Sequence, residues 1–273
     1  MRLCDLPDSS MTLPSPLVET AARGPGGTRM DMVPEEVPVA LSFNGISHAV
    51  MLASPTDLED FALGFSLSEG ILADPGELYD LELEIETRGV VVQMHIAEAR
   101  FVELKNRRRA LAGRTGCGLC GVESLDQVAR TLAPLPAGPA VAAAALHRAL
   151  AQLQQKQPLH ASTGGVHAAA WADATGDLQM VREDVGRHNA LDKLIGALAK
   201  DQRDPAAGFA LVTSRASFEM VQKAASVGIP ILAAVSAPTG YAIRLAQEVG
   251  LALAGFVRQG RYTVYSTPER IET

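Results

Sequence analysis

The chain has 273 residues, of which 47% are hydrophobic, so it can bury a core in one large domain or two smaller ones. Its formal net charge of −7 argues against a protein that holds nucleic acid through phosphate contacts. The first 30 residues lack the basic start and apolar run of a signal peptide, and no apolar run reaches the roughly 18 residues of a membrane helix. We therefore expect a cytoplasmic protein without a membrane segment.

The N-terminal region opens with a polar stretch and then turns into structured chain. Residues 1–34 are rich in Pro, Ser, Gly and Thr and are predicted to form a flexible tail. Val37–Phe43 and Ile46–Leu52 flank Asn44-Gly45, the strongest short signal for a β-hairpin.

A helix and a second strand pair follow in this region. Thr56 and Glu59 match a capping box ahead of an amphipathic helix that ends at Gly70. Leu81–Glu86 alternates apolar and acidic residues, as a half-buried strand does, and Val90–Ile96 returns beside it. We expect residues 35–133 to form a small α+β region that ends in a cysteine loop.

That cysteine loop, Gly113–Gly121, holds Cys117 and Cys120 in a Cys-x-x-Cys spacing among four glycines. Arg114 and the basic stretch Lys105–Arg109 lie close by, and positive charge lowers a thiol pKa and favours the reactive thiolate. A structural disulfide is disfavoured in a cysteine-poor chain without a secretory signal. Thiol-based redox or sulfur transfer and a zinc half-site completed by histidines both stay open.

The second region, residues 140–273, follows a proline-rich linker at Pro134–Pro139. Ala140–Gln157 is alanine-rich and predicts a helix. Strands are then predicted at Val166–Ala172 and Leu178–Glu183. The polar run Glu183–Asn189 combines acidic, basic and imidazole side chains, which ordinary loops rarely need, and it leads into an amphipathic helix.

From Gly208 onward the chain alternates strands and helices. The predicted strands are Phe209–Val212, Ile229–Val235 and Leu251–Val257, with a helix before each of the last two. This spacing indicates parallel βαβ units.

Two polar loops follow strands and precede helices in this alternation. They are Thr213–Ser217, which contains Ser214, Arg215 and Ser217, and Ser236–Gly240. If the strands are parallel, both loops lie at the carboxyl edge of one sheet, where open α/β sheets bind ligands. Hydroxyls, an arginine and two helix N-termini together predict a site for phosphate or another oxyanion.

Several motifs in one order make the sequence similar to a known family, the FdhD formate dehydrogenase accessory sulfurtransferases. The resemblance covers about Val37–Pro268. It rests on these segments: Glu59–Phe65 with Ser68–Gly70, Gly113–Gly121, Thr163–Ala169, Glu183–Lys193, Ser214–Lys223 and Gly255–Arg258.

The resemblance implies a sulfur carrier and the partners that such a carrier needs. The chain would take sulfane sulfur from a cysteine desulfurase and pass it to the bis-molybdopterin guanine dinucleotide cofactor before that cofactor enters apo-formate dehydrogenase. The cofactor would be a bound substrate, and no permanent cofactor or metal is implied. We also expect a homodimer.

The resemblance also implies site residues and a fold. Cys117 matches the cysteine that forms the persulfide, and Cys120 would assist or resolve it. The segment that matches the cofactor-binding stretch consists of Phe256, Val257, Arg258, Gln259, Gly260 and Arg261. The implied architecture is α/β: a small N-terminal mixed sheet with helices, and a larger three-layer C-terminal domain that resembles the cytidine deaminase fold.

Two rival functions follow from the same residues. A zinc deaminase needs His-x-Glu followed by Pro-Cys-x-x-Cys, whereas here Ala168 and Ala169 follow His167, so we reject that function. The other rival is a chaperone, without catalysis, that binds the cofactor or the apo-enzyme. In it the cysteine pair would hold zinc together with His160, His167 or His188.

Overall fold

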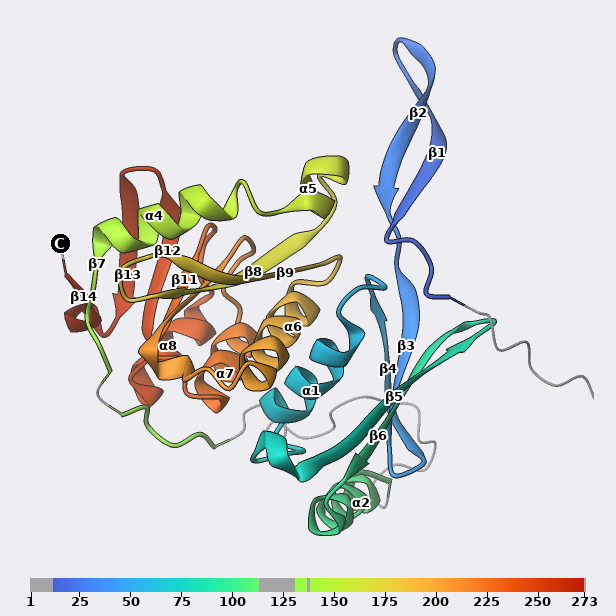
Figure 1. The fold of residues 1–273 in the computed structure, drawn as a ribbon. Helices are drawn as coiled ribbons and strands as arrows, with labels where there is room; N and C mark the ends of the chain where they lie inside the picture. The colour runs from blue at the N-terminus through green and yellow to red at the C-terminus, as the bar shows by residue number, and fades with distance from the viewer. Residues whose placement is uncertain (1–11, 113–130, 137, 273) are drawn as a thin grey trace, which may run out of the picture.

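The computed structural model describes residues 12–112, 131–136 and 138–272, apart from the side chains of residues 107–112 (Figure 1). It is a mixed α/β structure with two main sheets, one in each half of the chain. The smaller sheet has the strand order β4-β3-β6-β5. Its strands are β3 (Val37–Phe43), β4 (Ile46–Ala53), β5 (Leu78–Glu86) and β6 (Gly89–Ile96).

The predicted hairpins of this sheet are confirmed. Asn44 and Gly45 connect β3 to β4 with φ values of 46° and 79°, the left-handed backbone that this tight turn requires. β5 and β6 pair antiparallel, while β3 and β6 run parallel and bring the two hairpins together. Helices α1 (Leu58–Ser68) and α2 (Glu98–Ala112) bury apolar side chains against this sheet.

The start of α1 differs from the predicted capping box. Its N-cap is Asp57, which has a left-handed backbone (φ 50°) and makes no capping hydrogen bond. The hydroxyl of Thr56 instead accepts a hydrogen bond from the Lys193 ammonium at 3.4 Å. Lys193, 137 residues further along the chain, therefore binds the hydroxyl that the local sequence pattern assigned to capping the helix.

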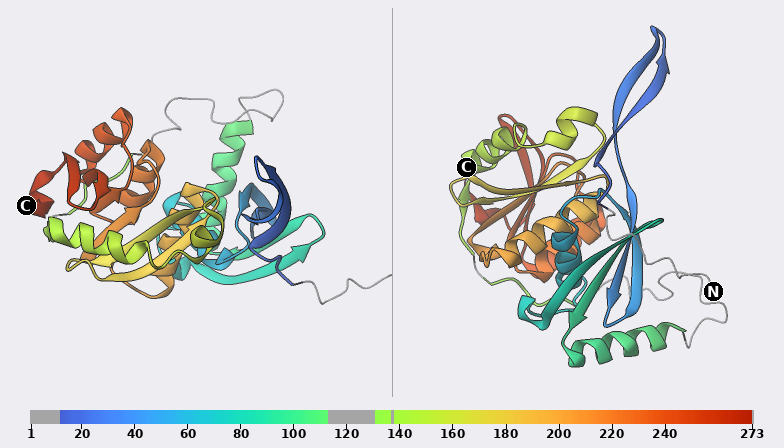
Figure 2. Two further views of the ribbon diagram at one scale, coloured as in Figure 1. Left: turned by 90° about the horizontal axis from the view of Figure 1, so that it is seen from above. Right: turned by 45° about the vertical axis from the view of Figure 1, so that its right-hand side comes forward.

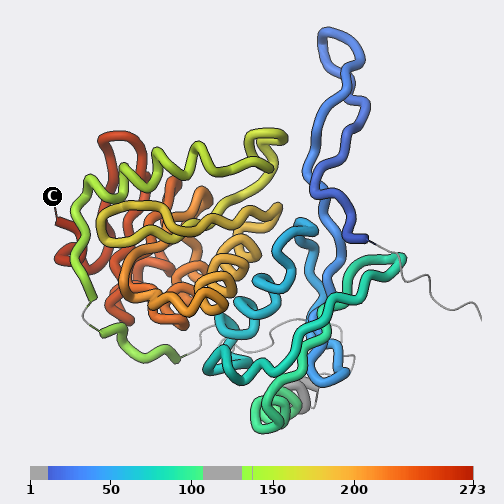
Figure 3. Tube along the Cα trace, viewed as in Figure 1, coloured from blue at the N-terminus to red at the C-terminus, as the bar shows by residue number. Residues whose placement is uncertain are grey.

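The N-terminal stretch is not a structureless tail throughout. β1 (Leu17–Gly24) and β2 (Gly27–Pro34) pair antiparallel along their full length. They form an arm that projects from the body in Figure 1, in the right-hand view of Figure 2 and in Figure 3. The flexible-tail prediction is therefore wrong for residues 17–34, because Pro25-Gly26 is a turn signal between two strands.

The larger sheet has the strand order β13-β12-β11-β10-β8-β9. Its strands are β8 (His167–Asp173), β9 (Leu178–Asp184), β10 (Gly208–Val212), β11 (Ile231–Ala234), β12 (Ala252–Arg258) and β13 (Arg261–Ser266). β10, β11 and β12 are parallel, as predicted, whereas β8 and β13 flank them in the antiparallel sense.

Helices cover both faces of the larger sheet and make three layers (Figure 2). The helices α6 (Arg187–Lys200), α7 (Phe218–Ser226) and α8 (Gly240–Val249) pack on one face. On the other face lies α4 (Ala143–Leu153), which is shorter than the predicted helix over 140–157. The three-layer arrangement is confirmed, and the likeness to the cytidine deaminase fold stays a prediction.

Short elements complete the larger half. They are β7 (Val141–Ala142), α5 (Pro158–Thr163), β14 (Ile271–Glu272) and the 3-10 turns η2 (Pro205–Ala207) and η3 (Pro268–Arg270), while a further 3-10 turn, η1 (Pro75–Glu77), precedes β5 in the smaller half. The linker is anchored on this half, since the Leu135 N–H donates to the Val249 carbonyl at 2.8 Å.

α1 and α6 join the two halves, lying against each other between the two sheets (Figure 1). Gly64 of α1 and Gly196 of α6 sit at the crossing, where each lies against the backbone of the other helix. Buried ion pairs flank it, including Lys223 with Asp192 at 3.0 Å. Among the described helices, none is long and apolar enough to cross a membrane.

Candidate functional site

The two polar loops predicted to share the carboxyl edge of the sheet lie side by side. The Val235 N–H donates to the Val212 carbonyl and the Thr239 N–H to the Ala216 carbonyl, both at 3.0 Å. Because β10, β11 and β12 are parallel, both loops stand at the ends of these strands. The sequence prediction of one shared edge is confirmed.

The two loops differ in what they leave available to a ligand. Thr239 caps α8, since its hydroxyl accepts from the Ala242 N–H at 3.3 Å. Ser217 stands at the N-cap of α7 but makes no capping hydrogen bond, and its hydroxyl lies 3.5 Å from His188 Nε2. Only the first loop therefore presents a helix N-terminus without a side-chain cap.

The other predicted residues of that loop play unequal parts. Ser214 is buried, and its hydroxyl donates to the Arg215 carbonyl at 3.0 Å, so it stabilises the turn. Arg215 is exposed, and no described residue forms an ion pair with its guanidinium. Of the predicted residues in this loop, Arg215 and Ser217 are those that can meet an anion, Ser217 beside its 3.5 Å contact with His188 Nε2.

A polar cluster that the sequence did not assign to the site lies next to this loop. α6 begins at Arg187 behind Gly186, which supplies no side-chain cap. His188 Nε2 lies 2.8 Å from the Glu219 carboxylate, and the buried Nε of Arg187 has no hydrogen-bond partner in the described part of the chain. His167 begins β8 at the same edge. The density of polar residues in Glu183–Asn189 was the signal for this cluster.

The histidines add little positive charge at neutral pH. Burial lowers the pKa of His188, and the Arg187 charge lowers it further, while the Glu219 carboxylate opposes both. Burial also lowers the pKa of His167, again with help from Arg187. The lasting positive charge beside the first loop therefore comes from Arg187 and Arg215 and not from the histidines.

The predicted cofactor-binding stretch lies at the same edge, where β12 turns into β13. Phe256, Arg258, Gly260 and Arg261 line an open pocket of about 560 Å³ with Tyr262 and Thr263. The Phe256 N–H donates to the Ser236 carbonyl at 3.2 Å, which joins this stretch to the second loop.

The side chains of that stretch differ in exposure. Phe256 is 43% exposed and holds a left-handed backbone (φ 54°), which costs energy in a residue with a side chain. Val257 is fully buried in the core against α4, so its side chain is not available to a ligand. Gln259 lies at the exposed tip between the two strands.

The cysteine pair lies outside the described residues. α2 ends at Ala112, and Cys117 and Cys120 follow in a segment that is not described, as is Cys4. Within the described residues no group of three or more His, Cys, Asp or Glu side chains is placed to hold a metal ion.

Comparison with known proteins points to one family. The model of the FdhD/NarQ family matches residues 34–272. Proteins called sulfur carrier protein FdhD are 57% identical over 242 residues in Cupriavidus necator and 56% identical over 268 residues in Bordetella bronchiseptica. The matches cover 89% and 96% of this chain and 84% and 97% of those proteins.

A solved structure is similar to this chain as well. It belongs to a protein assigned as a formate dehydrogenase accessory protein from Desulfotalea psychrophila. The two structures superpose with a TM-score of 0.72 at 25% sequence identity, over 93% of this chain and 98% of that one.

Proposed function

The chain belongs to the FdhD/NarQ family, and we propose that it is a sulfurtransferase that carries sulfane sulfur as a persulfide on Cys117. The relatives' name, sulfur carrier protein, supports this role. The thiolate of Cys117 attacks the outer sulfur of a desulfurase persulfide. One S–S bond forms, the old one breaks, and the desulfurase cysteine leaves as a thiolate. Cys120 assists or resolves the persulfide.

The acceptor in this proposal is the bis-molybdopterin guanine dinucleotide cofactor, bound as substrate at the carboxyl edge. The observation that carries it is the pair of uncapped helix N-termini, α6 and α7, with Arg187 and Arg215 beside them. Helix N-termini and arginines bind phosphate oxygens, and the cofactor carries pyrophosphates. Arg258 and Arg261 extend the positive edge along the sheet.

The remaining parts of the proposal concern the setting of the reaction. A cysteine desulfurase supplies the sulfur and apo-formate dehydrogenase receives the finished cofactor, in the cytoplasm, from a homodimer. A chaperone with a Cys/His zinc site is the alternative, and the name of the relatives supports it less. About one zinc per purified chain, lost when either cysteine is replaced, would favour the alternative.

Sulfur loading tests the role of Cys117. After incubation with a cysteine desulfurase and cysteine, intact-mass analysis of the wild type should show the added mass of one sulfur atom. Cys117→Ala should show none, because Cys117 matches the persulfide-forming cysteine of the family and lies three residues from Arg114. Cys4→Ala is the control and should load like the wild type. Equal loading of Cys117→Ala would sink the assignment.

Nucleotide binding tests the carboxyl edge separately. Arg215→Ala should weaken GDP binding about tenfold in calorimetry at low salt, the loss of one charge-assisted hydrogen bond. The control is Arg88→Ala, which removes an exposed arginine in the β5–β6 turn and should leave the affinity unchanged. Absence of GDP binding to the wild type would show that this edge is not a nucleotide site.

A further inference from the structure

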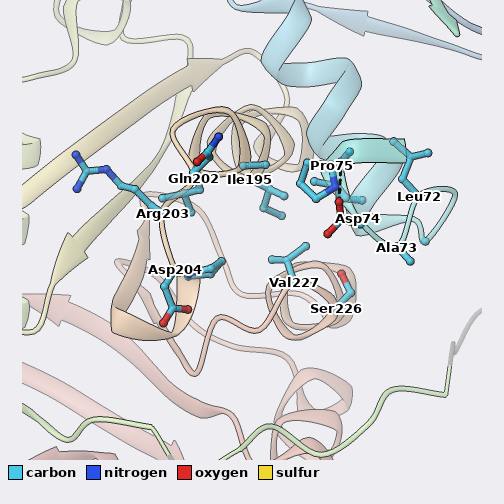
Figure 4. A pocket seen from close by; sticks show the side chains of 16 residues that line it. Leu72, Ala73, Asp74, Pro75, Ile195, Gln202, Arg203, Asp204, Ser226 and Val227 are labelled. Carbon is cyan, nitrogen blue, oxygen red and sulfur yellow. Dashed lines mark hydrogen bonds between the residues drawn. The ribbon is translucent and has the colours of Figure 1, made fainter. Parts of the chain in front are cut away.

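A second pocket, of about 980 Å³ (Figure 4), is lined by residues at the C-terminal ends of helices whose N-termini form the candidate site. α6 and α7 begin at the carboxyl edge and end here, at Lys200 and Ser226, and α1 ends beside them at Ser68. The pocket spans the two halves of the molecule, because residues from α1 and from α6 both line it.

Apolar side chains form part of the lining of the pocket. Ile195 and Leu198 come from α6, Val227 follows α7, and Leu67 comes from α1. Figure 4 shows Ile195 and Val227 between the two walls of the pocket. This surface suits an aliphatic chain.

The walls carry negative charge in two equivalent turns. Asp74 caps η1 and Asp204 caps η2, and each is followed by proline. One oxygen of each carboxylate accepts a backbone N–H, from Gly76 at 2.7 Å and from Ala206 at 2.9 Å. Neither carboxylate forms an ion pair within the described ranges. The C-terminal ends of three helices add partial negative charge to the same space.

The neighbouring cations are engaged elsewhere. Arg203 points away from the pocket (Figure 4) and pairs with Asp201 at 2.6 Å. Lys200 pairs with Asp60 at 2.9 Å and Lys223 with Glu69 at 2.6 Å. The apolar part of the lining is therefore bordered by carboxylates that lack a positive partner among the described residues.

We propose that this pocket binds an arginine or lysine side chain presented by a partner protein. The aliphatic stem lies on Leu67 and Val227, the partly exposed apolar side chains of the lining, and the cationic head meets Asp74 and Asp204. Long basic side chains combine these two properties, and the volume leaves room for neighbouring residues of the same segment. A metal ion fits less well, because two capping carboxylates are too few ligands.

The inference goes beyond the proposed sulfur transfer and does not depend on it. A partner held at the helix C-termini leaves the carboxyl edge open, because α6 and α7 separate the two places along their length. The pocket therefore suits a docking contact that leaves the candidate site accessible.

NMR titration of the full chain with a blocked Leu-Arg dipeptide amide tests the pocket. Amide shifts should appear at Asp74, Ile195 and Val227, and a blocked Leu-Glu dipeptide amide should cause none. Asp74→Asn and Asp204→Asn keep the capping acceptor and remove only the charge. Each should raise the Kd at least threefold, and both together about tenfold, with weaker binding at high salt.

A matched control separates this pocket from general charge effects. Asp80→Asn removes an exposed carboxylate on β5, outside the pocket, and should leave the Kd unchanged. Thermal melts of the Asn variants should match the wild type, which shows that the turns stay folded. Equal binding of the acidic dipeptide, or an unchanged Kd in the double variant, would overturn the proposal.

Discussion

Replacing Gly64 with alanine should lower the free energy of unfolding by about 3 kcal/mol, at the upper end for overpacked cores. A Cβ atom at Gly64 would lie 1.7 Å from the Asp192 carbonyl oxygen of α6. The obstacle is backbone, so no side-chain rotation relieves it and the two helices must move apart. Urea unfolding followed by circular dichroism measures the change.

Gly240→Ala is the matched control for this prediction. Gly240 begins α8, and a Cβ there would meet only the flexible end of Arg244 at 3.7 Å. Alanine has the higher helix propensity, so this variant should be unchanged or more stable by up to about 1 kcal/mol. If Gly64→Ala were as stable as Gly240→Ala, the close crossing of α1 and α6 would be wrong.

The Gly64 contact matters for function because α1 carries one side of the buried network. The Asp192 carboxylate, fully buried, accepts from Ser68 Oγ at 2.6 Å and from Lys223 Nζ at 3.0 Å. Forcing α1 away from α6 breaks the Ser68–Asp192 bond and disturbs the start of α6, where the candidate site lies. GDP affinity should therefore fall together with stability in Gly64→Ala.

The sequence predicted the parts of the fold that depend on local periodicity. The Asn44-Gly45 turn requires left-handed backbone that few residues adopt, so its signal was specific. The alternation after Gly208 contained enough apolar residues per strand to show that β10, β11 and β12 are buried and parallel. The shared edge of their loops follows from that topology alone.

Features that depend on distant partners were missed. Thr56 matched a local cap, but Lys193 lies within reach of its hydroxyl only in the folded chain. Val257 sits in a motif that resembles a cofactor-binding stretch, yet strand alternation turns it into the core while Phe256 faces outward. The arm at residues 17–34 has weak alternation and no core of its own, so composition suggested a tail.

The candidate site also contains residues that the sequence predicted and residues that it missed. Ser217 and Arg215 were found because both stand in one loop between a strand and a helix. His188 and Glu219 are 31 positions apart, and only the packing of α6 against α7 places them 2.8 Å from each other. The predictions for Cys117 and Cys120 depend on the sequence and the family, since both lie outside the described residues.

The buried pair Lys193–Asp184 is the second place where a substitution should have a large effect. Both side chains are fully buried, and Nζ lies 2.7 Å from the carboxylate. The same carboxylate accepts the Ser54 N–H at 2.9 Å, and the Ser54 carbonyl accepts Nζ at 3.0 Å. This arrangement ties the β4–α1 connection of the first half to the second half.

Lys193→Met should therefore lower the free energy of unfolding by about 3–5 kcal/mol, because it leaves the Asp184 charge buried without its partner. Burial lowers the pKa of Lys193, and the negative charge of Asp184 opposes that effect. The buried ammonium and the buried carboxylate therefore stabilise each other's charge. The double variant Lys193→Met with Asp184→Asn should lose less than the sum of the two single losses.

Lys200→Met provides the comparison on the same helix. Lys200 also forms ion pairs, with Glu59 at 3.0 Å and Asp60 at 2.9 Å, but its side chain is 47% exposed. Water screens such a pair, so the loss should stay below about 1 kcal/mol. Similar losses for Lys193→Met and Lys200→Met, or strictly additive losses in the double variant, would contradict a buried and coupled pair. The predicted difference arises from burial, since the substitution, the helix and the type of partner are the same.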